Sequence, residues 1–516
     1  MKKTGKIIAL LLLFALILSG CSGPSDSGDP GVPENAEEPK DTLRMVAREI
    51  NYTFDPTKPQ TDGYFRRCGA IEALTYINAD GSVTPWLAES VDQIDTNHWD
   101  IVLRENAVFW SGKPVTADAV IASLERSASE NVGMQAALEG ITFEIKSDYL
   151  IGATTEMPDF DLPLALEGIS IYNAEKDLSC FEEIDFTGMY RIVEHEARQK
   201  IVLEINEDYY GVKPKIENVI YEEIPDDDAR IALALSGQAD IVSGLPVTAA
   251  KQIEESNQMD LYISNPSGTL EVYLNHDREA ISDVRVRQAL NWGTDRQELV
   301  DVATEGYGMG VSTWLGSNPL FTDKDKHPVY TEYSTEKAAE LLDEAGWKVG
   351  ADGIREKNGK KLTFKLYTWG NEKTMGELLQ MQWAKIGVDV DVNHVDWSVI
   401  EESWTTGDWD GFIASWNHYG NMYSIISNHY AKDGTFNYSN YRSDEFDAKL
   451  EELKNTPDKE SKKEIIWEIN LLLARDGVRV PMLPRPSVIA VNKHLKGYET
   501  HFMTHPNCIT NKLEFE

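Results

Sequence analysis

The chain has 516 residues, of which 41% are hydrophobic and 26% charged, and its formal net charge is −37 at pH 7. Such an acidic chain is a poor partner for nucleic acid and for anionic membrane surfaces. The length suggests about three domains, with enough apolar residues for a large core.

The first 20 residues predict a signal peptide. Three lysines stand among the first six residues, and residues 7–18 form an apolar run too short to span a bilayer as a finished helix. The order Leu18-Ser19-Gly20-Cys21 resembles a bacterial lipobox, whose cysteine receives diacylglycerol when the leader is removed. Two acyl chains anchor a protein stably. We therefore expect an extracytoplasmic protein held at the cell membrane through Cys21, with an ordinary secretory signal as the alternative.

Residues 21–41 are expected to be the lipid anchor and a flexible linker, because they are rich in Ser, Gly, Pro and acidic residues. The body that follows predicts an α/β fold. Thr116 is expected to cap a helix that carries Asp118 in its first turn. Strand, helix and strand in order over residues 219–242 predict a parallel βαβ unit.

The second half repeats this organisation. Asp295 is expected to start a helix after a break near Gly293, and Ser334 to cap a helix that ends at Gly346. Residues 362–366, 372–386 and 388–392 predict strand, helix and strand, and hence a second βαβ unit.

Common catalytic patterns are absent from the sequence. It has no GxSxG elbow, HExxH helix, GxxxxGK[ST] loop or EF-hand loop. After Cys21, the cysteines are Cys68, Cys180 and Cys508, which form no CxxC motif and leave both one disulfide and free thiols open. We predict a protein that is not an enzyme and has no cofactor of its own.

Several ordered blocks resemble the extracytoplasmic solute-binding proteins of bacterial ABC importers, in the peptide/nickel-binding group called family 5. They include residues 80–90, 99–104, 108–120, 187–190, 206–214, 234–242, 283–290 and 338–347. The resemblance implies a two-lobe periplasmic-binding-protein-like fold (type II, cluster C). Lobe I would be residues 42–282 plus 492–516, with an extra subdomain at about 78–177, and lobe II residues 283–491. Most of these blocks are expected to be scaffold, with Trp86 in the core.

The resemblance also suggests the ligand. Peptide receptors of this group hold the peptide ammonium with an aspartate inside a segment like W-x-x-D-Y-x-D-P, and residues 416–423 contain no acid. Asn421 is expected in the place of that aspartate, and an amide lacks the charge of a strong ammonium pair. Residues 80–90 and 353–359 resemble nickel-type members, which bind the metal as a chelate with small acids or amino acids. The arginine that anchors acid in some of them has no counterpart in residues 166–172.

The resemblance implies a cleft with the following residues. Tyr64, Arg66 and Arg67 would lie in a loop after the first strand, where an arginine fork, preferably Arg67, takes a carboxylate. The second lobe would contribute Trp369, Trp404, Trp416, Asn417, His418, Tyr419 and Asn421. His418 is the candidate metal ligand, because nickel accepts imidazole readily. His394 and His429 are expected to be surface residues.

The predicted function is a monomeric solute receptor that delivers a nickel chelate or a related small solute to an ABC permease of two transmembrane subunits with ATPases. Nickel would enter as part of the transported ligand. A receptor for dipeptides or oligopeptides is the alternative within this class. A surface hydrolase on the same fold and a signalling or adhesive lipoprotein stay open as other classes.

Overall fold

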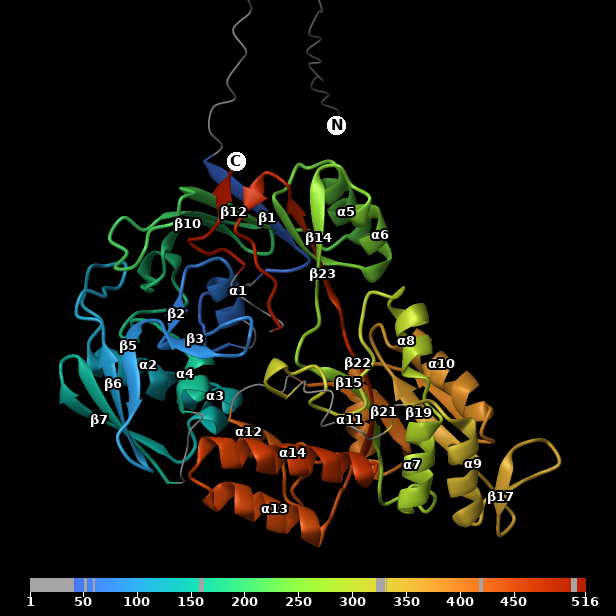
Figure 1. Cartoon of the computed structure of the whole chain (residues 1–516). Helices are drawn as coiled ribbons and strands as arrows, with labels where there is room; N and C mark the ends of the chain where they lie inside the picture. The colour runs from blue at the N-terminus through green and yellow to red at the C-terminus, as the bar shows by residue number, and fades with distance from the viewer. Residues whose placement is uncertain are drawn as a thin grey trace, which may run out of the picture. The chain divides into compact units, whose positions relative to one another are not determined.

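The computed structural model describes residues 41–50, 53–58, 61–156, 162–321, 330, 332–416, 421–502 and 508–516. The predicted leader, Cys21 and the linker lie outside the described residues, and so do Asn417, His418 and Tyr419. Figure 1 shows that the remainder is built from β-sheets with helices packed against them. This is the mixed α/β fold that the sequence predicts.

The first large sheet has the strand order β10-β11-β12-β1-β13-β23-β14. Strand β1 pairs in parallel with β12 and with β13, and α5 (Asp227–Leu235) connects these two strands. The predicted βαβ unit over residues 219–242 is therefore confirmed. The strands are Thr42–Ala47 (β1), Tyr190–Glu196 (β10), Lys200–Ile205 (β11), Asn218–Glu223 (β12), Ile241–Leu245 (β13), Met259–Ser264 (β14) and Ser487–Asn492 (β23).

The second large sheet has the order β20-β19-β21-β15-β22. Strands β19 and β20 pair in parallel and are connected by α10 (Lys373–Ala384), which confirms the second predicted βαβ unit. Leu379 and Trp383 of α10 are fully buried in the core of this lobe. The strands are Thr269–Leu274 (β15), Thr363–Thr368 (β19), Asp389–His394 (β20), Gly411–Ser415 (β21) and Arg479–Pro484 (β22).

The chain passes between the two sheets twice. Residues 265–268 lead from β14 to β15, and Arg485 and Pro486 lead from β22 to β23 (Figure 1). The sheets therefore divide the chain at these two links, whereas the sequence places the lobe boundaries at 282/283 and 491/492. Both predicted boundaries lie too far toward the C-terminus. The reason is that β15 and β23 are almost wholly buried strands, and their composition does not reveal which sheet they join.

The two links leave each sheet at the same edge. In the second sheet β15 is antiparallel to β21, and β22 is antiparallel to β15, so β22 runs in the same direction as β19, β20 and β21. In the first sheet β1, β12, β13 and β14 likewise end where β23 begins. Open α/β sheets bind ligands beyond the carboxyl ends of their strands. We call these two edges the binding edges of lobe I and lobe II.

A third sheet, β5-β6-β8-β7, lies inside the range 78–177 expected for the extra subdomain. Its strands are Ala88–Gln93 (β5), His98–Leu103 (β6), Ile141–Ser147 (β7) and Leu150–Thr155 (β8). Helix α2 (Ala117–Glu130) buries Val120 and Leu124 in a separate core beneath this sheet. Thr116 caps α2 by accepting the N–H of Ala119, as predicted.

The other predicted helix starts are also confirmed. Asp295 accepts the N–H of Glu298 at the start of α8 (Arg296–Ala303), and Ser334 accepts that of Lys337 at the start of α9 (Thr335–Glu344). The remaining helices are Thr61–Arg67 (α1), Val132–Ala137 (α3), Leu162–Glu167 (α4), Ala250–Glu254 (α6), Val284–Trp292 (α7), Trp397–Thr406 (α11), Met422–Tyr430 (α12), Asp444–Asn455 (α13) and Lys459–Arg475 (α14).

Cys68, Cys180 and Cys508 form no disulfide within the described residues, and Cys68 and Cys508 are buried. Burial raises the pKa of the Cys68 thiol to about 12, so this side chain behaves as a small apolar group. Within the described ranges, no helix has the length and apolarity needed to cross a membrane.

Candidate functional site

Aromatic side chains gather at the binding edge of lobe II. Trp369 directly follows β19 and Trp416 directly follows β21, and both were predicted as site residues. Parallel strands in one sheet bring these positions to the same edge. We call the cluster the aromatic wall; it consists of Trp369, Trp397, Trp404, Trp416, Phe436 and Tyr438.

Ring contacts hold the aromatic wall together. The rings of Trp404 and Tyr438 stack with centroids 3.9 Å apart, and those of Trp416 and Phe436 with centroids 5.3 Å apart. The indole N–H of Trp369 donates to the carbonyl of Ile413 at 3.1 Å. The indole nitrogens of Trp404 and Trp416 are buried and have no hydrogen-bond partner in the described part of the chain. Buried indole N–H groups normally find an acceptor, so these two are unused donors in the wall.

Helix α12 brings His429 against the same wall. This side chain is 5% exposed, and its ring centroid lies 5.8 Å from that of Trp416 and 5.2 Å from that of Phe436. The prediction that His429 is a surface residue is therefore wrong. The signal that could have found it is helical spacing, since Met422, Ile426 and His429 lie on one buried face.

A buried charge network fixes α12 to the sheet. Arg479 on β22 donates to the carboxylate of Glu271 at 3.0 Å, to the hydroxyl of Tyr273 at 2.9 Å and to the backbone carbonyl of His429 at 3.1 Å. Burial raises the pKa of Glu271, and the charge of Arg479 acts in the opposite direction. Because the network is enclosed, it orients His429 from behind the wall and does not reach solvent.

Arg485 stands at the binding edge of lobe II without having been predicted there. It follows β22 and forms an ion pair with Glu372. The side chain of Arg485 is 51% exposed, whereas that of Glu372 is 3% exposed. The backbone N–H of Glu372 donates to the carbonyl of Trp369, which keeps this pair beside the aromatic wall. Only the strand order reveals the position of Arg485, because its local sequence carries no motif.

The predicted site residues of lobe I are in its core. Tyr64, Arg66 and Arg67 belong to the short helix α1, where a loop was expected, and all three are buried. Arg66 donates to the carboxylate of Glu167 at 2.8 Å and to its carbonyl at 2.9 Å. Arg67 donates to the hydroxyl of Tyr221 at 3.2 Å. The structure thus contradicts the expected loop, and it buries the arginine side chains that were expected to face the cleft.

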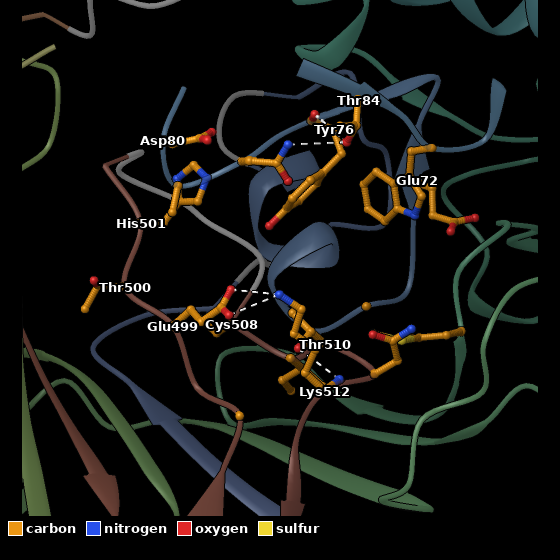
Figure 2. Close-up of a pocket in the computed structure, with 18 of the residues that line it drawn as sticks. Glu72, Tyr76, Asp80, Thr84, Glu499, Thr500, His501, Cys508, Thr510 and Lys512 are labelled. Carbon is orange, nitrogen blue, oxygen red and sulfur yellow. Dashed lines mark hydrogen bonds and ion pairs between the residues drawn. The ribbon is translucent and has the colours of Figure 1, made fainter. Parts of the chain in front are cut away.

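Lobe I also contains a cavity of about 580 Å³. It is bounded by the hairpin of β3 (Thr75–Ile77) and β4 (Val83–Pro85) and by residues near the C-terminus. Figure 2 shows the rings of Tyr76 and His501 on one side and the ion pair of Glu499 with Lys512 on the other. Trp86 lines this cavity, edge to face with Tyr76 at 5.4 Å, which corrects the expectation that it is core.

Glu72, whose side chain is buried, also lines the cavity. One of its oxygens accepts hydrogen bonds from Tyr209 at 2.6 Å and Tyr210 at 3.1 Å. Burial raises the pKa of Glu72 to about 7, although these two hydroxyls, Thr187 and Arg104 lower it. Glu72 therefore titrates near neutrality, which makes it a probe of this part of lobe I.

The remaining predicted positions follow Trp416 in the sequence. Asn421 caps α12, because its side-chain oxygen accepts the N–H of Ser424 at 3.1 Å. Asn421 therefore stabilises the start of the helix. Counting W-x-x-D from Trp416 places the aspartate position at Tyr419, so the expectation that Asn421 takes the place of that aspartate is wrong. Asn417, His418 and Tyr419 are not among the described residues. Among the residues that are, no group of three His, Cys, Asp or Glu side chains could hold a metal ion.

Comparisons with known proteins agree with this geometry. The oligopeptide-binding protein AppA of Bacillus subtilis is 26% identical over 96% of each chain, and the nickel-binding protein NikA of Staphylococcus aureus is 25% identical over 96% of each chain. The crystal structure of NikA from Brucella suis in complex with Fe(III)-EDTA superposes with a TM-score of 0.82 at 22% identity, covering 92% of this chain and all of that one.

The chain also matches the model of a protein family. The model described as bacterial extracellular solute-binding proteins, family 5 Middle, matches residues 82–437. The match runs from the β3–β4 hairpin in lobe I to Asn437, one residue before Tyr438 of the aromatic wall, and covers more than half of the chain. The chain therefore belongs to the bacterial extracellular solute-binding proteins of family 5.

Proposed function

We propose that this protein is the solute receptor of an ABC importer and captures a nickel chelate or a related small acidic solute between its two lobes. Membership of a family of extracellular solute-binding proteins supports the receptor role. The two links join the binding edges, so a solute held there touches both lobes when they close. A ligand that binds the closed form better shifts the population toward it.

The observation that carries the choice of ligand is the aromatic wall. It offers flat indole and phenol faces, and the ring of His429 packs against Trp416 and Phe436. Residues 416–423 contain no acid that would pair with a peptide ammonium. A compact chelate with planar imidazole or carboxylate groups suits such a wall, and His418 remains the proposed metal contact. The names of relatives include nickel-binding proteins.

A second candidate is a receptor for dipeptides or oligopeptides. It is favoured by the similarity to the oligopeptide-binding protein AppA over 96% of the chain. Calorimetry separates the two candidates: the protein is titrated with a preformed complex of nickel and L-histidine and with a dipeptide library. We expect micromolar or tighter binding of the complex. Dipeptide binding at that strength without metal, together with no response to the complex, would reject the chelate.

The remaining parts of the proposal concern location and partners. Lipidated Cys21 and the linker after it would keep the receptor at the cell membrane, near a permease of two transmembrane subunits with ATPases, at high effective concentration. The receptor acts as a monomer and converts no substrate. In a cell without an outer membrane, a Cys21→Ser form should bind solute normally but support uptake poorly. Undiminished uptake would show that the anchor is dispensable.

A further inference from the structure

We propose that Arg485 and Arg48, one from each binding edge, form the anion-binding pair of the cleft and hold carboxylate groups of the solute. This inference rests on the proposed receptor function and adds the chemistry of its ligand. It also replaces the predicted fork of Arg66 and Arg67, whose donors serve Glu167 and Tyr221 inside lobe I.

Arg485 has guanidinium donors beyond the one that its ion pair uses. A guanidinium carries several N–H donors in a planar fork that matches a carboxylate. In the described chain the hydrogen bond of Arg485 is the one to Glu372, so most of its N–H groups have no acceptor. Because the side chain is 51% exposed at the end of β22, these groups are open to a solute at the binding edge.

We assign Glu372 as a positioning residue for Arg485. Its carboxylate is buried, and its second oxygen has no hydrogen-bond partner among the described residues. Losing Arg485 would leave a buried charge alone, which is costly. A solute carboxylate should therefore add to the existing pair, using the N–H groups that Glu372 leaves unoccupied, and should not displace Glu372.

Arg48 lies at the other binding edge, that of lobe I. It directly follows β1, is exposed, and has no hydrogen bond or ion pair with another described residue. Its Cβ stands 3.3 Å from the position that a Cβ on Gly244 would occupy, next to the carboxyl end of β13. Gly244 thus allows Arg48 to lie close to the neighbouring strand at the binding edge of lobe I.

The placement of one arginine on each lobe bears on closure of the lobes. In a chain with a net charge of −37, two cations with unused donors at the binding edges create a local attraction for anions against the overall field. A solute that carries carboxylate groups gains both arginines only when it bridges the lobes. Its negative charge would then be an affinity determinant and would favour the closed form.

The experiment compares acids with their amides. Isothermal titration uses two matched probe pairs: nickel–L-histidine against nickel–L-histidinamide, and the dipeptide Ala-Phe against its C-terminal amide. In the wild type we expect each acid that binds to bind at least tenfold more tightly than its amide. The variants are Arg485→Gln, Arg485→Lys, Arg48→Gln and Glu372→Gln. Arg442→Gln is the control, since Arg442 is 54% exposed and pairs with Asp277 at 2.8 Å beyond the opposite end of β15.

Arg485→Gln and Arg48→Gln should each weaken acid binding by roughly 10- to 100-fold, leave amide binding unchanged and so remove the acid–amide ratio. Arg485→Lys should restore part of that ratio, Glu372→Gln should reduce it, and Arg442→Gln should keep it. Loss of folding alone would weaken acid and amide equally, so the ratio reports the anion contact itself.

The outcomes separate this inference from the proposed ligand. Preference for the Ala-Phe acid with no response to the nickel complexes overturns the chelate and supports the arginine pair. A nickel complex bound equally well as acid and as amide overturns the arginine pair and supports the chelate. If neither acid binds, both are overturned, and an acid–amide ratio that survives both arginine substitutions also overturns the pair.

Discussion

Two arginine–glutamate pairs in this molecule have the same chemistry and opposite surroundings. Arg66 and Glu167 in lobe I are 8% and 4% exposed, whereas Arg485 and Glu372 at the edge of lobe II are 51% and 3% exposed. Each pair buries a glutamate, but only the second leaves guanidinium donors open to solvent. An arginine can therefore serve the scaffold or a ligand, and the difference depends on which of its donors are already used.

The strongest way to test this contrast is to remove Arg66. An Arg66→Ala change removes the ion pair of the buried Glu167 carboxylate with Arg66, and loss of one partner in a buried pair costs about 3–5 kcal/mol of unfolding free energy. Urea denaturation measures this change. A double Arg66→Met, Glu167→Leu variant should recover much of the loss, and Arg442→Ala on the surface should cost about 1 kcal/mol or less. An Arg66→Ala protein of normal stability that no longer binds solute would reverse the assignment.

Glu72 is a third buried glutamate, and its carboxyl group accepts hydrogen bonds from two tyrosines where the other two pair with an arginine. Its pKa rises from an ordinary 4.5 to about 7, so the folded protein holds this proton more tightly than the unfolded chain within that pH window. The group therefore favours folding at low pH, and this contribution is lost as the pH rises through about 7.

Relative to Glu72→Gln, the wild type should lose about 3 kcal/mol of stability across the window from pH 4.5 to about 7. Denaturant titrations of both proteins at several pH values measure the difference, which removes the contribution of the other titrating groups. Parallel pH profiles for the two proteins would show that the carboxyl group is not perturbed.

The aromatic wall tests the ligand-contacting region of the molecule, because changes in the wall should affect solute binding more than folding. Trp416→Ala should weaken solute binding by about 2 kcal/mol, roughly 30-fold in Kd, as expected for a central aromatic contact. Calorimetry with nickel–L-histidine measures it. Trp292→Ala is a matched control, since Trp292 is a partly buried indole of lobe II that packs under Lys337 at 4.1 Å. Equal effects of both changes on Kd would remove the wall from the site.

Asn421 gives the smallest expected effect. As the cap of α12 it should contribute about 1 kcal/mol to stability, which Asn421→Ala would lose and Asn421→Asp would largely keep. The unfolding free energy of the three proteins measures this order. A drop in solute affinity without a drop in stability would instead restore the ligand contact that the sequence predicts.

Local chemistry explains which features could be predicted from the sequence. The caps at Thr116, Asp295 and Ser334 and the two βαβ units depend on neighbouring residues and on regular spacing, so they are visible in the chain itself. Trp369 and Trp416 were proposed from the resemblance to the family, and the structure places them directly after β19 and β21; their contact with solute stays a prediction. The burial of Arg66 and the exposure of Arg485 depend on Glu167 and Glu372, which are remote in sequence. The local sequence around an arginine does not indicate which remote acidic residue it will pair with.

The position of β23 has a consequence for how the chain is made. This strand lies between β13 and β14, and among the described strands β14 pairs with no other in its sheet. A chain delivered from its N-terminus completes lobe II, up to Pro484, before Ser487–Asn492 exist to pair with β14. Lobe I therefore begins first and is finished last, through contacts of long sequence separation that form slowly. A chain that stops before Ser487 would leave β14 as an unpaired strand, ready to associate with another chain.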